Sequence, residues 1–229
     1  MTLPVHGTNV TFRPASRQLL LNGSARWYYR VMVATANWNA EQFHQWYSRM
    51  PVEKRAQVWD ELRSDQKKLY TEWRTFRDFA NVAPLDIDPR TIDNREPPEP
   101  DVHCLISSKE HYFELGEVTD QALARAAGIA AKQGQDVFAG QFSQLAPLIR
   151  IFQRKCAKTY DTNGRPVHLL LHYSVGHQVP HSALLRAEVS QGQQAIMREL
   201  QNSPFSSLWL YDGWEKEIID IIEIQPSAS

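Results

Sequence analysis

The pattern of apolar and polar positions after residue 100 switches repeatedly between strand-like and helix-like periods. Short β-prone runs are separated by turn-forming residues, and longer stretches show apolar positions three and four residues apart. The expected elements are strands at 102–107 and 111–115, helices at 121–133 and 138–156 (Pro147 kinking the second or starting a new helix), a strand at 166–173, a helix at 182–200, a strand at 207–211 and a terminal helix or strand at 214–224. This order predicts an α/β (α+β) fold with a mixed central sheet flanked by helices.

The pattern before residue 97 is mainly helical and rich in tryptophan. Short strands are expected at 9–12 and 19–21, and Asn39 is expected to cap a helix. Apolar residues at helical spacing then predict an amphipathic helix from Val52 to Phe76, with an interruption near 64–65. Its apolar positions are Val52, Ala56, Trp59, Leu62, Leu69, Trp73 and Phe76. Its charged face is either solvated or a basic strip for a phosphate backbone.

Five of the seven tryptophans lie before residue 80, and we interpret them mainly as core residues. Base stacking and a homodimer surface are the alternatives. The proline cluster at 97–100 cannot continue a helix, so it divides the chain. We therefore expect a helical N-terminal region at 1–96, for recognition or dimerisation, and an α/β core at 97–229.

Composition narrows the function classes. The chain of 229 residues has 42% hydrophobic and 22% charged residues, as soluble globular proteins do. No apolar run approaches the roughly 20 residues of a membrane helix, so no membrane partner is expected. No signal peptide is visible, and Cys104 and Cys156 are interpreted as reduced core thiols, which together predict a cytoplasmic protein. A net charge of −1 argues against strong sequence-independent DNA binding but leaves room for a local basic patch.

Two acidic residues interrupt the first predicted hairpin. Asp101 follows Pro100 at the start of one strand, and Glu114 lies within the next strand. A carboxylate in an apolar strand is costly to bury without a partner. Two carboxylates aimed at one point suit a hard cation such as Mg²⁺, which takes oxygen ligands and keeps several waters.

Residues 97–215 resemble the PD-(D/E)XK restriction-endonuclease-like superfamily. The resemblance is carried by Pro100–Asp101, by Glu114 on the following strand, and by the helix that leads to a buried strand. It implies a nuclease whose Asp101 and Glu114 bind one or two Mg²⁺ or Mn²⁺ ions. It also implies nucleic acid as substrate, and we expect DNA in preference to RNA.

The sequence departs from the family at Gly116, where the family usually has a lysine that orients the water or stabilises the transition state. The family sometimes takes this lysine from the next helix, which makes Lys155 and Lys158 candidates here. Glu117 is a candidate third metal ligand, although strand alternation places it on the face opposite Glu114 unless the strand ends or bulges. The alternatives are that both lysines lie on a solvated helix face, and that an inactive core acts by binding.

Other chemistry has weaker support in the sequence. His103, His111, His168 and His172 lie near predicted strands, and we interpret them as hydrogen-bonded strand residues because no zinc-binding spacing is present. No nucleophile elbow, P-loop or dinucleotide fingerprint is found either. A third interpretation remains, in which the carboxylates of an ordinary α/β domain only cap and pair.

Overall fold

A computed structural model describes residues 39–119, 129, 133, 145–173 and 182–223. The chain forms two compact units, and the boundary between them falls between Arg74 and Thr75. The unit that carries the sheet therefore includes residues 75–96, which we expected in the N-terminal region. The strands expected at 9–12 and 19–21, the helix expected at 121–133 and the start of the one expected at 138–156 lie outside the described residues.

The first unit contains α2 (Ala40–Ser48), α3 (Val52–Glu61) and the beginning of α4 (Ser64–Ala80). Asn39 caps α2 as expected, because its side chain accepts a hydrogen bond from the Gln42 amide at 2.9 Å and Gln42 reciprocates. The aromatic residues of these helices pack against one another. Ring contacts join Phe43, His44, Trp46, Tyr47, Trp59, Tyr70 and Trp73. The tryptophans at 46, 59 and 73 therefore belong to an aromatic core, as expected.

The interruption expected near 64–65 is present, and it divides the segment from Val52 to Phe76 into two helices. The backbone leaves the helical region at Leu62, where ψ is 141°, so α3 ends there and α4 starts at Ser64. The break interrupts the phase of the apolar stripe. Val52 and Ala56, which we expected to be buried, are exposed, whereas Val58 is buried.

The second unit is built on a six-stranded mixed sheet whose strands are adjacent in chain order. Its strands are β1 (Asp93–Asn94), β2 (Val102–Ile106), β3 (Lys109–Glu117), β4 (Val167–Tyr173), β5 (Ser207–Asp212) and β6 (Glu217–Glu223). Strands β3, β4 and β5 are parallel, and the other neighbours are antiparallel. The expected mixed α/β sheet is confirmed, and the terminal segment left open as helix or strand is a strand.

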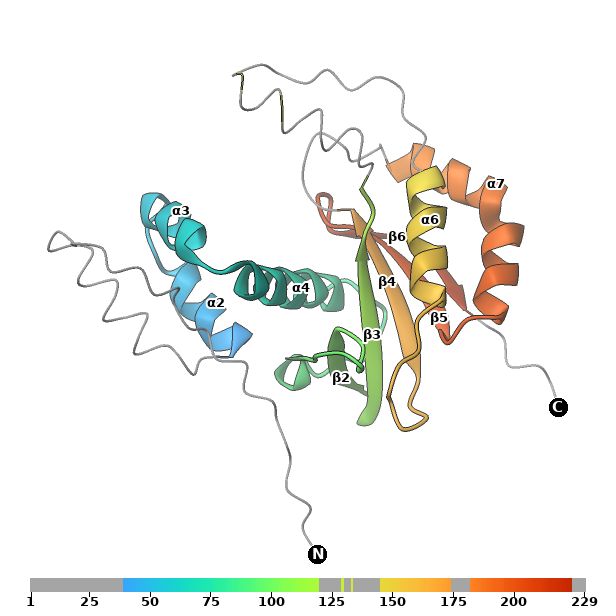
Figure 1. The fold of residues 1–229 in the computed structure, drawn as a ribbon, viewed down its shortest axis with the longest axis horizontal. Helices are drawn as coiled ribbons and strands as arrows, with labels where there is room; N and C mark the ends of the chain where they lie inside the picture. Colours follow the sequence, from blue (N-terminus) through green and yellow to red (C-terminus); the bar gives the residue numbers. More distant parts are fainter. Residues whose placement is uncertain (1–38, 120–128, 130–132, 134–144, 174–181, 224–229) are drawn as a thin grey trace, which may run out of the picture. The chain divides into compact units, whose positions relative to one another are not determined.

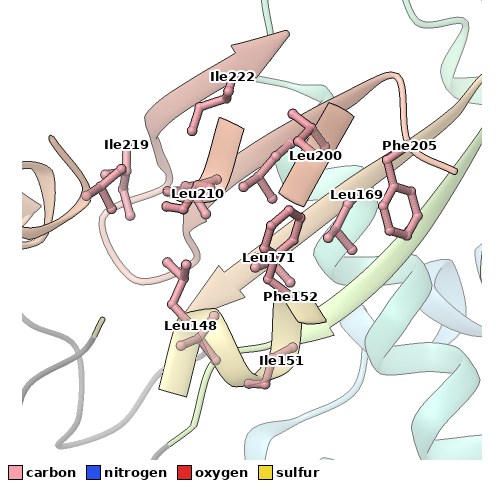
Figure 2. Close-up of a cluster of buried hydrophobic side chains, with 14 of the residues drawn as sticks. Leu148, Ile151, Phe152, Leu169, Leu171, Leu200, Phe205, Leu210, Ile219 and Ile222 are labelled. Atoms are coloured by element: carbon pink, nitrogen blue, oxygen red, sulfur yellow. The ribbon is translucent and has the colours of Figure 1, made fainter. Parts of the chain in front are cut away.

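Two helices connect the parallel strands and cover the same face of the sheet (Figure 1). They are α6 (Leu145–Cys156), between β3 and β4, and α7 (Ser182–Gln201), between β4 and β5. The β3–β4 and β4–β5 connections both move one strand further along the sheet in the same direction. Because such connections share one handedness, both helices lie on the same side of the sheet. Figure 2 shows the resulting core, in which Leu148 and Phe152 of α6 lie near Leu171 and Leu210 of the sheet.

The opposite face of the sheet packs against the end of α4, through Phe76 and Phe79. Cys104 lies in this second core, and burial raises the pKa of its thiol to about 12. Both cysteines are free, as expected. No helix among the described residues is long and apolar enough to cross a membrane.

Candidate functional site

The two acidic residues of the hairpin lie side by side. Strands β2 and β3 pair so that Val102 faces Phe113, and Asp101, one residue before Val102, therefore lies alongside Glu114. The backbone amide of Leu115 donates a hydrogen bond to Asp101 Oδ2 at 2.9 Å. This bond fixes the Asp101 carboxylate against the middle of β3.

Glu114 faces the α6 side of the sheet and is almost completely buried. Its Oε1 atom lies 2.5 Å from Lys155 Nζ and 2.8 Å from Lys158 Nζ. Lys155 Nζ also lies 3.7 Å from Asp101 Oδ2. Both carboxylates thus share one ammonium group, and the structure brings together the four residues that the sequence singled out. The solvated-face alternative for Lys155 is wrong, because its side chain is only 10% exposed.

The two lysines come from neighbouring backbone segments at the carboxyl end of α6. Lys155 belongs to the last turn of the helix, whereas Lys158 follows the helix and donates its amide to the Lys155 carbonyl at 3.1 Å. The carboxyl end of a helix carries partial negative charge, which favours cations there.

Gly116 leaves the space through which the Lys155 side chain passes. A Cβ atom at this position would lie 2.6 Å from Leu171 Cδ2, 3.1 Å from Ile151 Cγ2 and 3.6 Å from Lys155 Cε. The first distance is shorter than carbon atoms tolerate, so even alanine would force Leu171 to move. The Lys155 stem therefore lies beside the Gly116 position of β3.

Tyr160 also belongs to the site, although no sequence pattern singled it out. Its hydroxyl lies 3.4 Å from the Lys155 carbonyl oxygen, and its ring packs 5.6 Å from the Phe205 ring. Burial, followed by the negative charges of Glu114 and Asp101, raises the pKa of Tyr160. The phenol therefore stays protonated and can donate a hydrogen bond within the site. A tyrosine in a connecting loop has no periodicity that would reveal this position.

Glu117 stands apart from the other two acidic residues. It is the exposed last residue of β3, its strand partner on β4 is His172, and strand alternation places it on the face opposite Glu114. Within the part of the chain that the structure describes, no three His, Cys, Asp or Glu side chains form a group that could hold a metal ion. The candidate site therefore offers two carboxylates and leaves the role predicted for Glu117 without structural support.

The donor set fits Mg²⁺ or Mn²⁺. Mg²⁺ is usually held by one or two carboxylates and keeps several waters, and Asp101 and Glu114 supply two carboxylates within reach of one cation. In the structure that cation is the Lys155 ammonium. Two carboxylates and two ammonium groups balance one another, so the site is self-neutralised.

Two of the strand histidines, His111 and His168, form a hydrogen-bonded network on the other face of the sheet, as expected of strand histidines. His111 Nδ1 lies 2.9 Å from His168 Nε2, and His168 Nδ1 lies 2.7 Å from Ser207 Oγ. Trp209 Nε1 donates to the same hydroxyl at 2.7 Å. Burial and the neighbouring His111 lower the pKa of His168 to about 4, so the pair is neutral at physiological pH.

Comparisons with known proteins give no relative for this chain: no family model, curated protein or solved structure matches it. The side chains of the site are therefore the basis for proposing a function.

Proposed function

We propose that this protein is a divalent-metal-dependent nuclease with a restriction-endonuclease-like core. The observation that carries the proposal is the convergence of Asp101, Glu114 and Lys155, with the Lys155 stem beside Gly116. The order of elements gives further support, because a hairpin with both acids is followed by a helix and a buried parallel strand. The proposed substrate is DNA. The proposal also places the protein in the cytoplasm, as a homodimer that forms through its N-terminal region.

In this proposal Asp101 and Glu114 would hold the metal ion. When bound there, the ion would lower the pKa of a water molecule and neutralise charge that develops on the phosphate. The Leu115 amide keeps Asp101 oriented, so this ligand is positioned before the metal arrives. Lys155 places a positive charge beside both carboxylates, where it can orient the attacking water and stabilise negative charge on the reacting phosphate. Tyr160 remains protonated, because burial and the charges of Glu114 and Asp101 raise its pKa.

The test is metal-dependent cleavage of a panel of supercoiled plasmid, linear duplex DNA, single-stranded DNA and single-stranded RNA. The variants Asp101→Asn and Glu114→Gln should each reduce the Mn²⁺- or Mg²⁺-dependent rate by about 10²-fold or more, since each removes a charged metal ligand. Glu110→Gln is the matched control, because Glu110 lies on the same hairpin but forms only a surface ion pair with Arg165. Wild-type rates in both site variants, or no metal-dependent cleavage by the wild type, would overturn the proposal.

A binding protein with an inactive core is the second candidate. The pairing of Glu114 with two ammonium groups favours it, because this pairing satisfies the site without a metal. This candidate predicts that Mg²⁺ and Mn²⁺ do not raise the melting temperature. A metal that binds only the folded chain adds roughly 2.7 kcal/mol of stability at a hundredfold excess over its Kd.

A further inference from the structure

The two lysines of the site bind the same carboxylate oxygen but are held very differently. Both ammonium groups contact Glu114 Oε1, at 2.5 Å for Lys155 and 2.8 Å for Lys158. The Lys155 side chain is 10% exposed, whereas that of Lys158 is 49% exposed. One position is therefore enclosed by the fold, and the other opens to solvent.

Two donors on one carboxylate oxygen occupy its lone pairs. A carboxylate oxygen offers about two acceptor positions, and Oε1 of Glu114 has both filled. A divalent ion that approaches this oxygen meets two positive charges and no open position. One ammonium must leave before Oε1 can become a metal ligand.

The surroundings of the lysines decide which one leaves. The Lys155 stem passes Gly116 and belongs to the last turn of α6, and its ammonium also lies near Asp101. Lys158 follows the helix and is half-exposed, and among the described residues its ammonium is paired with Glu114. Water can solvate this ammonium when it leaves, so its release costs less than that of the enclosed Lys155 ammonium. Lys158 is the group that can move.

We propose that Lys158 is an exchangeable counterion that competes with the divalent metal for Glu114, while Lys155 stays in place. This inference rests on the proposed nuclease function, and it states which lysine must leave Glu114 before the metal ion binds. Metal binding releases the Lys158 ammonium toward solvent at the mouth of the site, where a substrate phosphate would arrive. Lys158 then serves as a phosphate contact, and Lys155 remains the fixed charge beside the carboxylates.

The test is a calorimetric titration of the full chain with Mn²⁺. Lys158→Gln should bind Mn²⁺ about fivefold more tightly than the wild type, which corresponds to the roughly 1 kcal/mol of an exposed ion pair. Lys158→Arg keeps the competing charge and should remain close to the wild type. Lys109→Gln, at an exposed lysine at the start of β3, is the matched control and should not change the Kd.

The outcomes separate this inference from the function on which it rests. An unchanged or weaker Kd in Lys158→Gln, with normal Mn²⁺ binding by the wild type, would overturn the competition and leave the nuclease proposal standing. Absence of Mn²⁺ binding by every variant would overturn both. Equal tightening in Lys158→Gln and Lys158→Arg would show that the side chain's shape, not its charge, obstructs the metal, and would also contradict the competition.

Discussion

The unequal burial of Lys155 and Lys158 makes a stability prediction that needs no knowledge of activity. Each is replaced by methionine, which keeps an unbranched apolar stem of four heavy atoms and removes the ammonium group. Both lysines contact the same oxygen of Glu114, so the two variants delete the same kind of ion pair in different surroundings. A difference between them therefore measures the effect of burial.

The magnitudes follow from the exposed fractions. Removing one partner of a buried ion pair typically costs 3–5 kcal/mol, because the other charge is left uncompensated. Lys158 still neutralises Glu114 when Lys155 is replaced, so we expect Lys155→Met to lose about 2–3 kcal/mol. Lys158→Met removes a half-exposed pair and should lose about 0–1 kcal/mol. Combining Lys155→Met with Glu114→Gln removes both charges and should recover part of the loss.

Amide hydrogen exchange at β4 is the assay. The slowest amides of a central strand exchange only when the whole unit unfolds, so their rates report the free energy of unfolding of the sheet unit alone. Equal losses in the two methionine variants would refute the reasoning. A loss under about 1 kcal/mol in Lys155→Met would refute it as well, since a buried pair would then be energetically equivalent to a surface pair.

Two further predictions concern other parts of the sheet. Gly116→Ala should destabilise the sheet unit by about 1–3 kcal/mol in urea denaturation, because its Cβ would lie 2.6 Å from Leu171 Cδ2, and unchanged stability would contradict the close packing. The pKa of His168, about 4 when folded against an ordinary 6.5, means that the unfolded chain binds the extra proton first as the pH falls. The contribution of neutral His168 to the free energy of unfolding is fully present above pH 6.5, and about 3 kcal/mol of it is lost as the pH falls from 6.5 through 4. The variant His168→Gln should therefore flatten that part of the stability–pH curve.

Much of the sheet follows from local patterns along the chain. Strand β4 has a nearly continuous apolar sequence because both of its faces are covered, and the hairpin of β2 and β3 has turn residues with positive φ at Ser107 and Ser108. The segment of β6 was ambiguous because its apolar residues fit a helix as well as a strand. The break between α3 and α4 was expected close to where it lies, but the exposure of Val52 and Ala56 was not, because apolar periodicity does not record a single change in ψ.

The site was predictable in its residue types but not in its arrangement. Two acids on a hairpin and two lysines near the end of a helix were visible in the sequence. The rotation of α6 about its axis decides which lysine is buried, and it depends on long-range packing against residues such as Leu171. The same packing brings Tyr160 to Glu114 from a loop without periodicity.

The location of a bound Mn²⁺ ion by anomalous scattering from crystals of the full chain tests the proposed site most directly. We predict one strong peak between the carboxylates of Asp101 and Glu114, with Lys158 turned away from Glu114 and Lys155 still beside both acids. A peak at any other carboxylate cluster, or crystals at saturating Mn²⁺ in which both lysines still contact Glu114 and no ion lies beside it, would contradict the proposed metal site.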